Sequence, residues 1–156
     1  MIILGIDPGY DRLGFAVIEK KPNTKELLLE SGCLTSDKKE VFSTRLAKIG
    51  LDLEKIFKKY KIDRLVIENL FITKNQKTAM RVAETRGMIL YLAGKVGSEV
   101  VELTPPQIKL AITGYGAADK NQVTKMAKLL ISIPPTVKLD DEFDAIVIAL
   151  AGLIKI

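Results

Sequence analysis

The first nine residues constrain the fold of this chain more than any other stretch. The apolar run 2–6 is typical of a buried strand, and it ends at Asp7, after which Pro8 and Gly9 stop the strand. Because proline biases the residue before it toward extended backbone, we expect the Asp7 carboxylate to stand at the strand's end. An ionised carboxylate beside buried strands needs a partner or a cation. The simpler alternative is that Asp7 only caps the turn, where aspartate is common.

Hydrophobic patterns predict that strands and helices alternate along the rest of the chain. We expect further strands at 13–19, 26–35, 64–68 and 99–103, and helices at 40–61, 77–96, 105–112, 119–130 and 140–154. This order indicates an α/β fold in which helices cover both faces of a mixed sheet. The 156 residues contain no linker or repeat, so we expect one domain over residues 1–156.

Composition excludes several classes of chemistry. The chain has no histidine, which excludes histidine-based acid–base catalysis, Ser-His-Asp triads and His-ligated zinc. Its one cysteine, Cys33, rules out an internal disulfide framework, and we expect it to pack as a small buried side chain. No apolar run is long enough for a membrane span, and the opening strand does not resemble a secretory signal. We therefore expect a cytoplasmic protein with no membrane partner.

The net charge of +5 is unevenly distributed. Residues 72–128 hold 9 basic and 4 acidic side chains, whereas residues 129–156 hold 2 basic and 4 acidic ones. A polyanion bound by the middle of the chain and a metal bound near its end would explain this pattern. A lysine-rich solvated face would explain the basic part equally well.

A second acid, Glu68, ends the buried strand 64–68. The helix at 40–61 allows this strand to lie parallel to the first strand. Asp7 and Glu68 would then emerge at the same carboxyl edge, where open α/β sheets place their ligands.

The last helix begins with a cluster of acids. Asp141 and Asp144 are three residues apart and share a helical face, which continues behind Asp144 as small and apolar residues. A helix packed on the sheet through that face brings both acids toward the carboxyl edge. Asp140 and Glu142 are explained more simply, because acids at a helix N-terminus complement the helix dipole.

Four converging carboxylates need a cation. Two unit charges about 4 Å apart, at an effective dielectric near 20, repel by about 4 kcal/mol. Oxygen ligands without histidine or cysteine favour Mg²⁺, which Mn²⁺ can replace. Two such ions suit in-line displacement at phosphorus, so the acids predict a metal-dependent phosphodiesterase.

Six short motifs resemble the RuvC family of Holliday-junction resolvases. They are Ile6-Asp7-Pro8-Gly9, Ile67-Glu68-Asn69-Leu70-Phe71, Thr85-Arg86-Gly87, Pro106-Gln107-x-Lys109, the stretch 114–123 and Asp141-x-x-Asp144-Ala145. They occur in family order over residues 1–153. The resemblance implies a ribonuclease H-like fold, with a five-stranded mixed sheet in the order 3-2-1-4-5.

The resemblance also implies a function. Family members are homodimers that cut four-way DNA junctions by paired symmetric nicks, leaving a 5′-phosphate and a 3′-hydroxyl. They work with the branch-migration proteins RuvA and RuvB. By resemblance the metal-binding catalytic acids are Asp7, Glu68, Asp141 and Asp144. Some relatives carry histidine at the position of Asp141, and the neighbouring Asp140 is the alternative ligand.

Six residues are expected to contact DNA. Lys109 and Lys120 match family lysines that contact the DNA backbone, and Phe71 matches an aromatic side chain that wedges against unpaired bases. The remaining candidates lie in or just after the polar loop that carries Phe71: Lys74, Lys77 and Arg81. The alternatives are that the lysines are merely solvated and that Phe71 packs in the core.

The helix at 77–96 is predicted to form a dimer interface. Ala79, Ala83 and Gly87 follow one another at four-residue spacing, and the second half, from Met88 through Leu90 to Ala93, is apolar nearly all round. One apolar stripe would cover the sheet, so the surplus can pack against a second copy. The alternative is a helix buried within the monomer.

Three other functions compete with junction resolution. A ribonuclease H-like nuclease acting on RNA or linear duplex would use the same acids. An actin-like ATPase shares Ile6-Asp7-Pro8-Gly9 but needs a second lobe and a longer chain. A module that binds junctions without cutting them would leave the four acids without a purpose.

Overall fold

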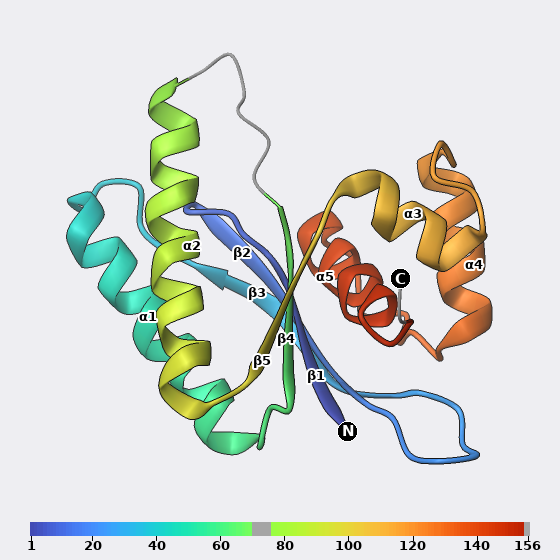
Figure 1. Cartoon of the computed structure of the whole chain (residues 1–156). Coiled ribbons are helices and arrows are strands. Elements are labelled where there is room, and N and C mark those ends of the chain that lie inside the picture. Colours follow the sequence, from blue (N-terminus) through green and yellow to red (C-terminus); the bar gives the residue numbers. More distant parts are fainter. Residues whose placement is uncertain (70–75, 155–156) are drawn as a thin grey trace.

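A five-stranded mixed sheet forms the centre of the computed structural model, which describes residues 1–69 and 76–154 (Figure 1). Its strands are β1 (Ile2–Asp7), β2 (Arg12–Glu19), β3 (Leu27–Thr35), β4 (Arg64–Glu68) and β5 (Glu99–Leu103). Their order across the sheet is β3-β2-β1-β4-β5. β1 pairs with β2 in antiparallel and with β4 in parallel orientation, and β5 is parallel to β4. The predicted fold class and strand order are confirmed.

In the described residues, five helices accompany the sheet close to their predicted positions. They are α1 (Phe42–Lys59), α2 (Gln76–Val96), α3 (Pro105–Thr113), α4 (Lys120–Leu130) and α5 (Asp140–Ala151). α5 ends three residues earlier than predicted. Just beyond its end, the Arg64 guanidinium donates a hydrogen bond to the carbonyl of Gly152 at 2.6 Å. No helix in the described part of the chain is both long and apolar enough to cross a membrane.

The two faces of the sheet carry separate hydrophobic cores. Figure 1 shows α1 and α2 on one side of the sheet, and α5 with α3 and α4 on the other. Because side chains alternate along a strand, Leu4 and Ile6 of β1 pack toward α1 and α2, whereas Ile3 packs toward α5. All three are completely buried. The central strand β1 is therefore apolar on both faces, as expected where a sheet is covered twice.

Two glycines let α5 lie directly on the sheet. A Cβ at Gly5 of β1 would clash with the backbone of Ala145 and Ala149, and one at Gly14 of β2 would clash with the carbonyl of Asp141. The small face predicted for this helix therefore lies against β1 and β2. This close packing brings the acidic first turn of α5 to the end of β1 that carries Asp7.

Cys33 differs from its prediction. It is half-buried rather than fully buried. The reason is its strand: β3 lies at the edge of the sheet, and every residue between its two ends is half-buried.

Candidate active site

Asp7 and Glu68 leave neighbouring strands at the same edge of the sheet. Ile6 of β1 is paired with Ile67 of β4 in parallel register, so the residues that follow them are adjacent. Both carboxylates are half-buried, and neither has a hydrogen-bond or ion-pair partner among the described residues. This is the arrangement that the sequence predicts.

The charges of the four predicted acids act on one another. Burial and, in decreasing order of size, the charges of Asp144, Glu68 and Asp141 together raise the pKa of Asp7 from 3.8 to about 7. Burial, followed by the charge of Asp144, likewise raises the pKa of Glu68. The pKa of Asp144 is raised, first by its burial. The sheet edge and the first turn of α5 thus form one anionic site.

Two positively charged side chains, Lys120 of α4 and Arg12 of β2, lie close to the acids of α5. Lys120 Nζ lies 3.4 Å from the Asp140 carboxylate and 4.0 Å from that of Asp144. Arg12 Nε forms an ion pair with Oδ2 of Asp141, although the two are not aligned as a hydrogen bond. The acids of α5 are therefore partly neutralised by direct ion pairs, whereas Asp7 and Glu68 have no ion-pair partner among the described residues.

The donor atoms of the site suit a hard divalent cation. All four side chains supply oxygen only, and two of the carboxylates are unpaired and half-buried beside each other, where a cation relieves repulsion. Across residues 1–69 and 76–154, no group of three or more acidic or cysteine side chains is arranged as it stands to hold a metal ion. The carboxylate of Asp141 is paired with Arg12 instead.

Lys109 and Lys120 lie beside two of the acids. A pocket of about 230 Å³ is lined by Glu68 and Asp144, by both lysines, and by the apolar side chains of Ile108, Val123, Val147 and Ile148. The first turn of α4 is fixed by a capping box, in which the Asp119 carboxylate accepts from the backbone N–H of Gln122 at 2.9 Å. Lys120 follows directly, so its place beside the acids is set by the start of this helix.

Of the other residues predicted to contact DNA, the two that the structure describes do not line this pocket. Lys77 is exposed in the first turn of α2. Arg81 is not free, because it pairs with Glu84 at 3.0 Å and its guanidinium lies 4.0 Å from the centre of the Phe42 ring. Phe71 and Lys74 lie outside the described residues.

Part of α2 presents small and apolar residues to solvent. Ala83 and Gly87 are exposed, Ala79 and Leu90 are half-buried, and a Cβ at Gly87 would meet nothing within 4 Å. Met80 and Tyr91, at opposite ends of this stripe, are 65% and 67% exposed. The rest of the helix contacts the core through Ile89, Leu92 and Ala93. The helix is thus buried on one side only, which argues against its being wholly enclosed by its own monomer.

Sequence reasoning assigned no role to Arg86, which the structure places at the site. Its side chain is 6% exposed and donates to the backbone carbonyl of Glu68 and to the Glu102 carboxylate. A signal was present, because Arg86 belongs to the motif Thr85-Arg86-Gly87 and lies just before the apolar half of the helix, where a buried arginine needs a partner. Its partners lie on β4 and β5, and the pattern of α2 alone does not identify them.

Comparisons with known proteins agree with this geometry. Residues 3–152 match the family model described as crossover junction endodeoxyribonuclease RuvC. The RuvC proteins of Petrotoga mobilis and Thermosipho melanesiensis are 42% and 43% identical over 149 residues, which cover 96% of this chain and 91% and 94% of theirs.

Solved structures show the same fold. The RuvC of T. thermophilus in complex with a Holliday junction substrate superposes with a TM-score of 0.91 at 26% identity, covering 98% of this chain and 93% of that one. The yeast mitochondrial Holliday junction resolvase Ydc2 shares the fold at a TM-score of 0.70 and 13% identity, covering 96% of this chain and 76% of its own. From the family match and the level of identity, this chain belongs to the RuvC family of crossover junction endodeoxyribonucleases.

Proposed function

We propose that this protein resolves four-way DNA junctions by nicking two opposed strands symmetrically. The observation that carries the proposal is the meeting of Asp7 and Glu68 at adjacent strand ends, with the acids of α5 held against them. Family membership adds the reaction class, and the close superposition on a RuvC bound to a Holliday junction substrate supports the substrate.

Membership of this nuclease family implies dependence on a divalent metal. We propose Mg²⁺, with two ions in each active site and Mn²⁺ as a substitute. Asp7, Glu68, Asp141 and Asp144 would hold them. Bound ions of this kind activate water and stabilise the leaving 3′ oxygen, and the products would carry 5′-phosphate and 3′-hydroxyl ends.

Asp141 is favoured over Asp140 as the third acid. Its backbone lies against Gly14, which is paired with Asp7 across the β1–β2 ladder, and its charge acts on Asp7. The Asp140 side chain is 79% exposed and faces Lys120 on α4. Releasing Asp141 from Arg12 would free its carboxylate for a metal and the arginine for a phosphate.

Lysines beside the acids would hold the substrate backbone. Lys109 and Lys120 line the pocket of Glu68 and Asp144, so a phosphate drawn there meets two positive charges next to the cation site. We propose that Lys77 and Arg81 bind the DNA further along α2. Phe71, stacking on an unpaired base, and Lys74 would add contacts from the segment between β4 and α2.

The exposed stripe of α2 supports a homodimer. Ala79, Ala83, Gly87 and Leu90 would pack against the same helix of a second copy, because small residues allow two backbones to approach closely. Two copies related by a two-fold axis carry two active sites, as paired nicks on opposed strands require. By family resemblance we also propose cooperation with RuvA and RuvB, and a cytoplasmic location.

Incubation with a synthetic four-way junction tests the function. With Mg²⁺ we expect symmetric nicks whose products a ligase can seal, and with EDTA we expect binding without cleavage. A linear duplex and an RNA–DNA hybrid of the same length separate junction resolution from general ribonuclease H-like cleavage. Binding without any Mg²⁺-dependent product would instead indicate a non-catalytic junction-binding module.

A further inference from the structure

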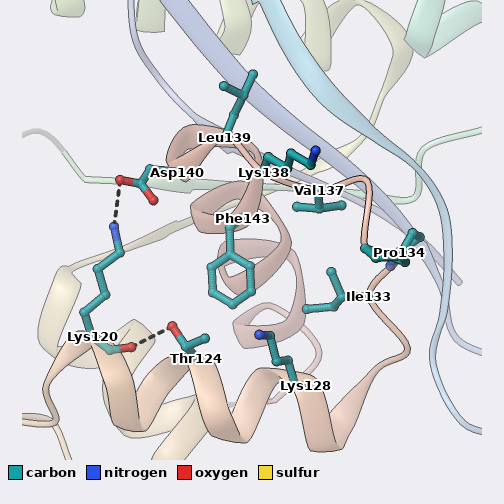
Figure 2. A pocket seen from close by; sticks show the side chains of 11 residues that line it. Lys120, Thr124, Lys128, Ile133, Pro134, Val137, Lys138, Leu139, Asp140 and Phe143 are labelled. Carbon is teal, nitrogen blue, oxygen red and sulfur yellow. Dashed lines mark hydrogen bonds and ion pairs between the residues drawn. The ribbon is translucent and has the colours of Figure 1, made fainter.

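A second, larger pocket lies on the other side of Lys120 from the active site. It has a volume of about 540 Å³ and is enclosed by α4 and by the segment that leads into α5. Figure 2 shows Lys120, Thr124 and Lys128 along one face of α4, with Lys138 on the opposite wall and Phe143 between them. The spacing of four residues places the three α4 side chains in one row.

The charges of this pocket are largely uncompensated. Lys128 and Lys138 are exposed and form no ion pair within the described part of the chain. Several lysines elsewhere do pair with acids, as Lys59 does with Glu30 and Lys95 with Glu54, each at 2.8 Å. Three lysines and a single acid, Asp140, therefore line one cavity.

Lys120 connects this pocket to the active site. It lines both pockets and lies 4.0 Å from the carboxylate of Asp144. Along α4, Lys128 lies about 12 Å beyond Lys120, since a helix rises 1.5 Å per residue. Positive charge thus extends from the acids in one direction, over a distance that a nucleic-acid strand spans with a few nucleotides.

We infer that this pocket binds the phosphodiester backbone of one junction arm, beside the strand that is cut. Lys128 and Lys138 hold phosphates there, and Lys120 lies between them and the scissile position. The apolar floor formed by Phe143, Ile133 and Val137 packs against the lysine stems and the sugars. This inference rests on the proposed junction substrate. It adds a contact region that no sequence motif of the chain indicated.

The competing explanation is that the lysines only cover the apolar floor with their stems. The double variant Lys128→Gln/Lys138→Gln removes both charges, and Lys128→Met/Lys138→Met removes them while retaining apolar stems. The matched control is Lys25→Gln/Lys61→Gln. Both control lysines are exposed, form no ion pair within the described part of the chain, and lie at the edge of the sheet opposite Asp7.

Junction binding is measured against salt concentration in an Asp7→Asn background, so that no strand is cut. Both pocket variants should bind about tenfold more weakly and lower the slope of log K against log salt by about 1 to 2, because fewer counterions are released. The control should match the parent protein. With Asp7 restored, the single-turnover cleavage rate at saturating protein should change less than threefold.

Three results overturn the inference. The first is a salt slope equal to that of the control, and the second is full binding by the methionine variant. The third concerns inorganic phosphate, added at constant ionic strength. If phosphate raises the melting temperature of the parent protein but not that of the glutamine variant, the pocket is a site for small anions. The proposed function fails separately, if the unaltered protein neither binds nor cuts a four-way junction.

Discussion

The buried guanidinium of Arg86 in α2 donates a hydrogen bond to the backbone carbonyl of Glu68 at the end of β4. The same side chain bonds the carboxylate of Glu102 on β5. One residue therefore ties the helix with the exposed small-residue stripe to the strand end that carries a predicted catalytic acid. Arg86 thus links α2 to both β4 and β5, which are already paired with each other through their backbones.

Replacing Arg86 should damage both stability and cleavage. Arg86→Met leaves the Glu68 carbonyl without its donor and Glu102 without its partner, so we expect unfolding to become easier by about 2–4 kcal/mol. Single-turnover cleavage should fall at least tenfold while junction binding in EDTA changes little. Arg86→Lys should recover part of both. Urea unfolding and cleavage under saturating protein measure these effects, and equal losses in binding and cleavage would refute the positioning role.

Neutralising one acid at a time should distinguish the proposed metal ligands from Asp140, which is not expected to bind metal. Asp7→Asn should lower Mg²⁺-dependent cleavage by about a thousandfold or more, because it removes a central charge of the site. Asp141→Asn should be strongly impaired, whereas Asp140→Asn should retain most activity. Cleavage of a labelled junction checks this order. If Asp140→Asn is the inactive one of that pair, the third ligand has been assigned to the wrong residue.

The metal-free protein should lose stability as the pH rises. The pKa of Asp7 is about 7 in the folded protein against an ordinary 3.8, so the folded state holds this proton more tightly than the unfolded state. The resulting stability is full below about pH 4 and is lost as the pH rises through 7. The difference between these two pKa values corresponds to at most about 4 kcal/mol of stability. Solvent near the half-buried carboxylate screens its interactions, so we expect a loss of roughly 1–3 kcal/mol.

Melting in EDTA between pH 5 and pH 8 tests this directly. Acids whose pKa is lowered, such as Asp11 beside Arg45, stay ionised throughout this window and do not contribute to the slope. Asp7→Asn should flatten the profile, and Mg²⁺ should stabilise the unaltered protein more at pH 8 than at pH 5. A stability that rises from pH 5 to pH 8 in EDTA contradicts the prediction.

A methyl group at Gly14 should displace α5. The added Cβ of Gly14→Ala clashes with the backbone of Asp141, which cannot move as a flexible side chain does. We expect a loss of about 2–4 kcal/mol and a large fall in cleavage, because the acids of α5 leave the sheet edge. Gly32→Ala on β3 is the control. The Cβ added there would meet a ring carbon of the Phe15 side chain at 3.1 Å and no backbone atom of α5. Chemical unfolding and cleavage assays compare the two.

Charge on the exposed stripe of α2 should prevent dimer formation. Ala83→Glu and Gly87→Glu place carboxylates where two copies are proposed to meet, and neither contacts the core of its own chain. We expect the mass in solution to halve and paired nicking to fall to single nicks. Leu129→Glu, on the 72% exposed side chain of α4, should leave the mass unchanged. Sedimentation or light scattering measures the mass, and a monomeric parent protein would refute the proposal.

Much of the architecture follows from local sequence signals. Strand and helix positions come from hydrophobic period and turn residues, so Pro8-Gly9 ends β1, and the Asp119 capping box begins α4 where the sequence predicts. The adjacency of Asp7 and Glu68 followed from two acid-ended strands and a helical crossover. The small face of α5 likewise predicted its close contact with the sheet.

Tertiary structure alone decided the partners of the charged residues. The ion pair of Arg12 with Asp141, the placement of Lys120 beside Asp144, and the bond from Arg86 to Glu68 join separate elements. The same holds for the pocket between α4 and α5. Hydrophobic period is a local property that a sequence displays directly, whereas a charge pair depends on which surfaces pack together and how each side chain turns there.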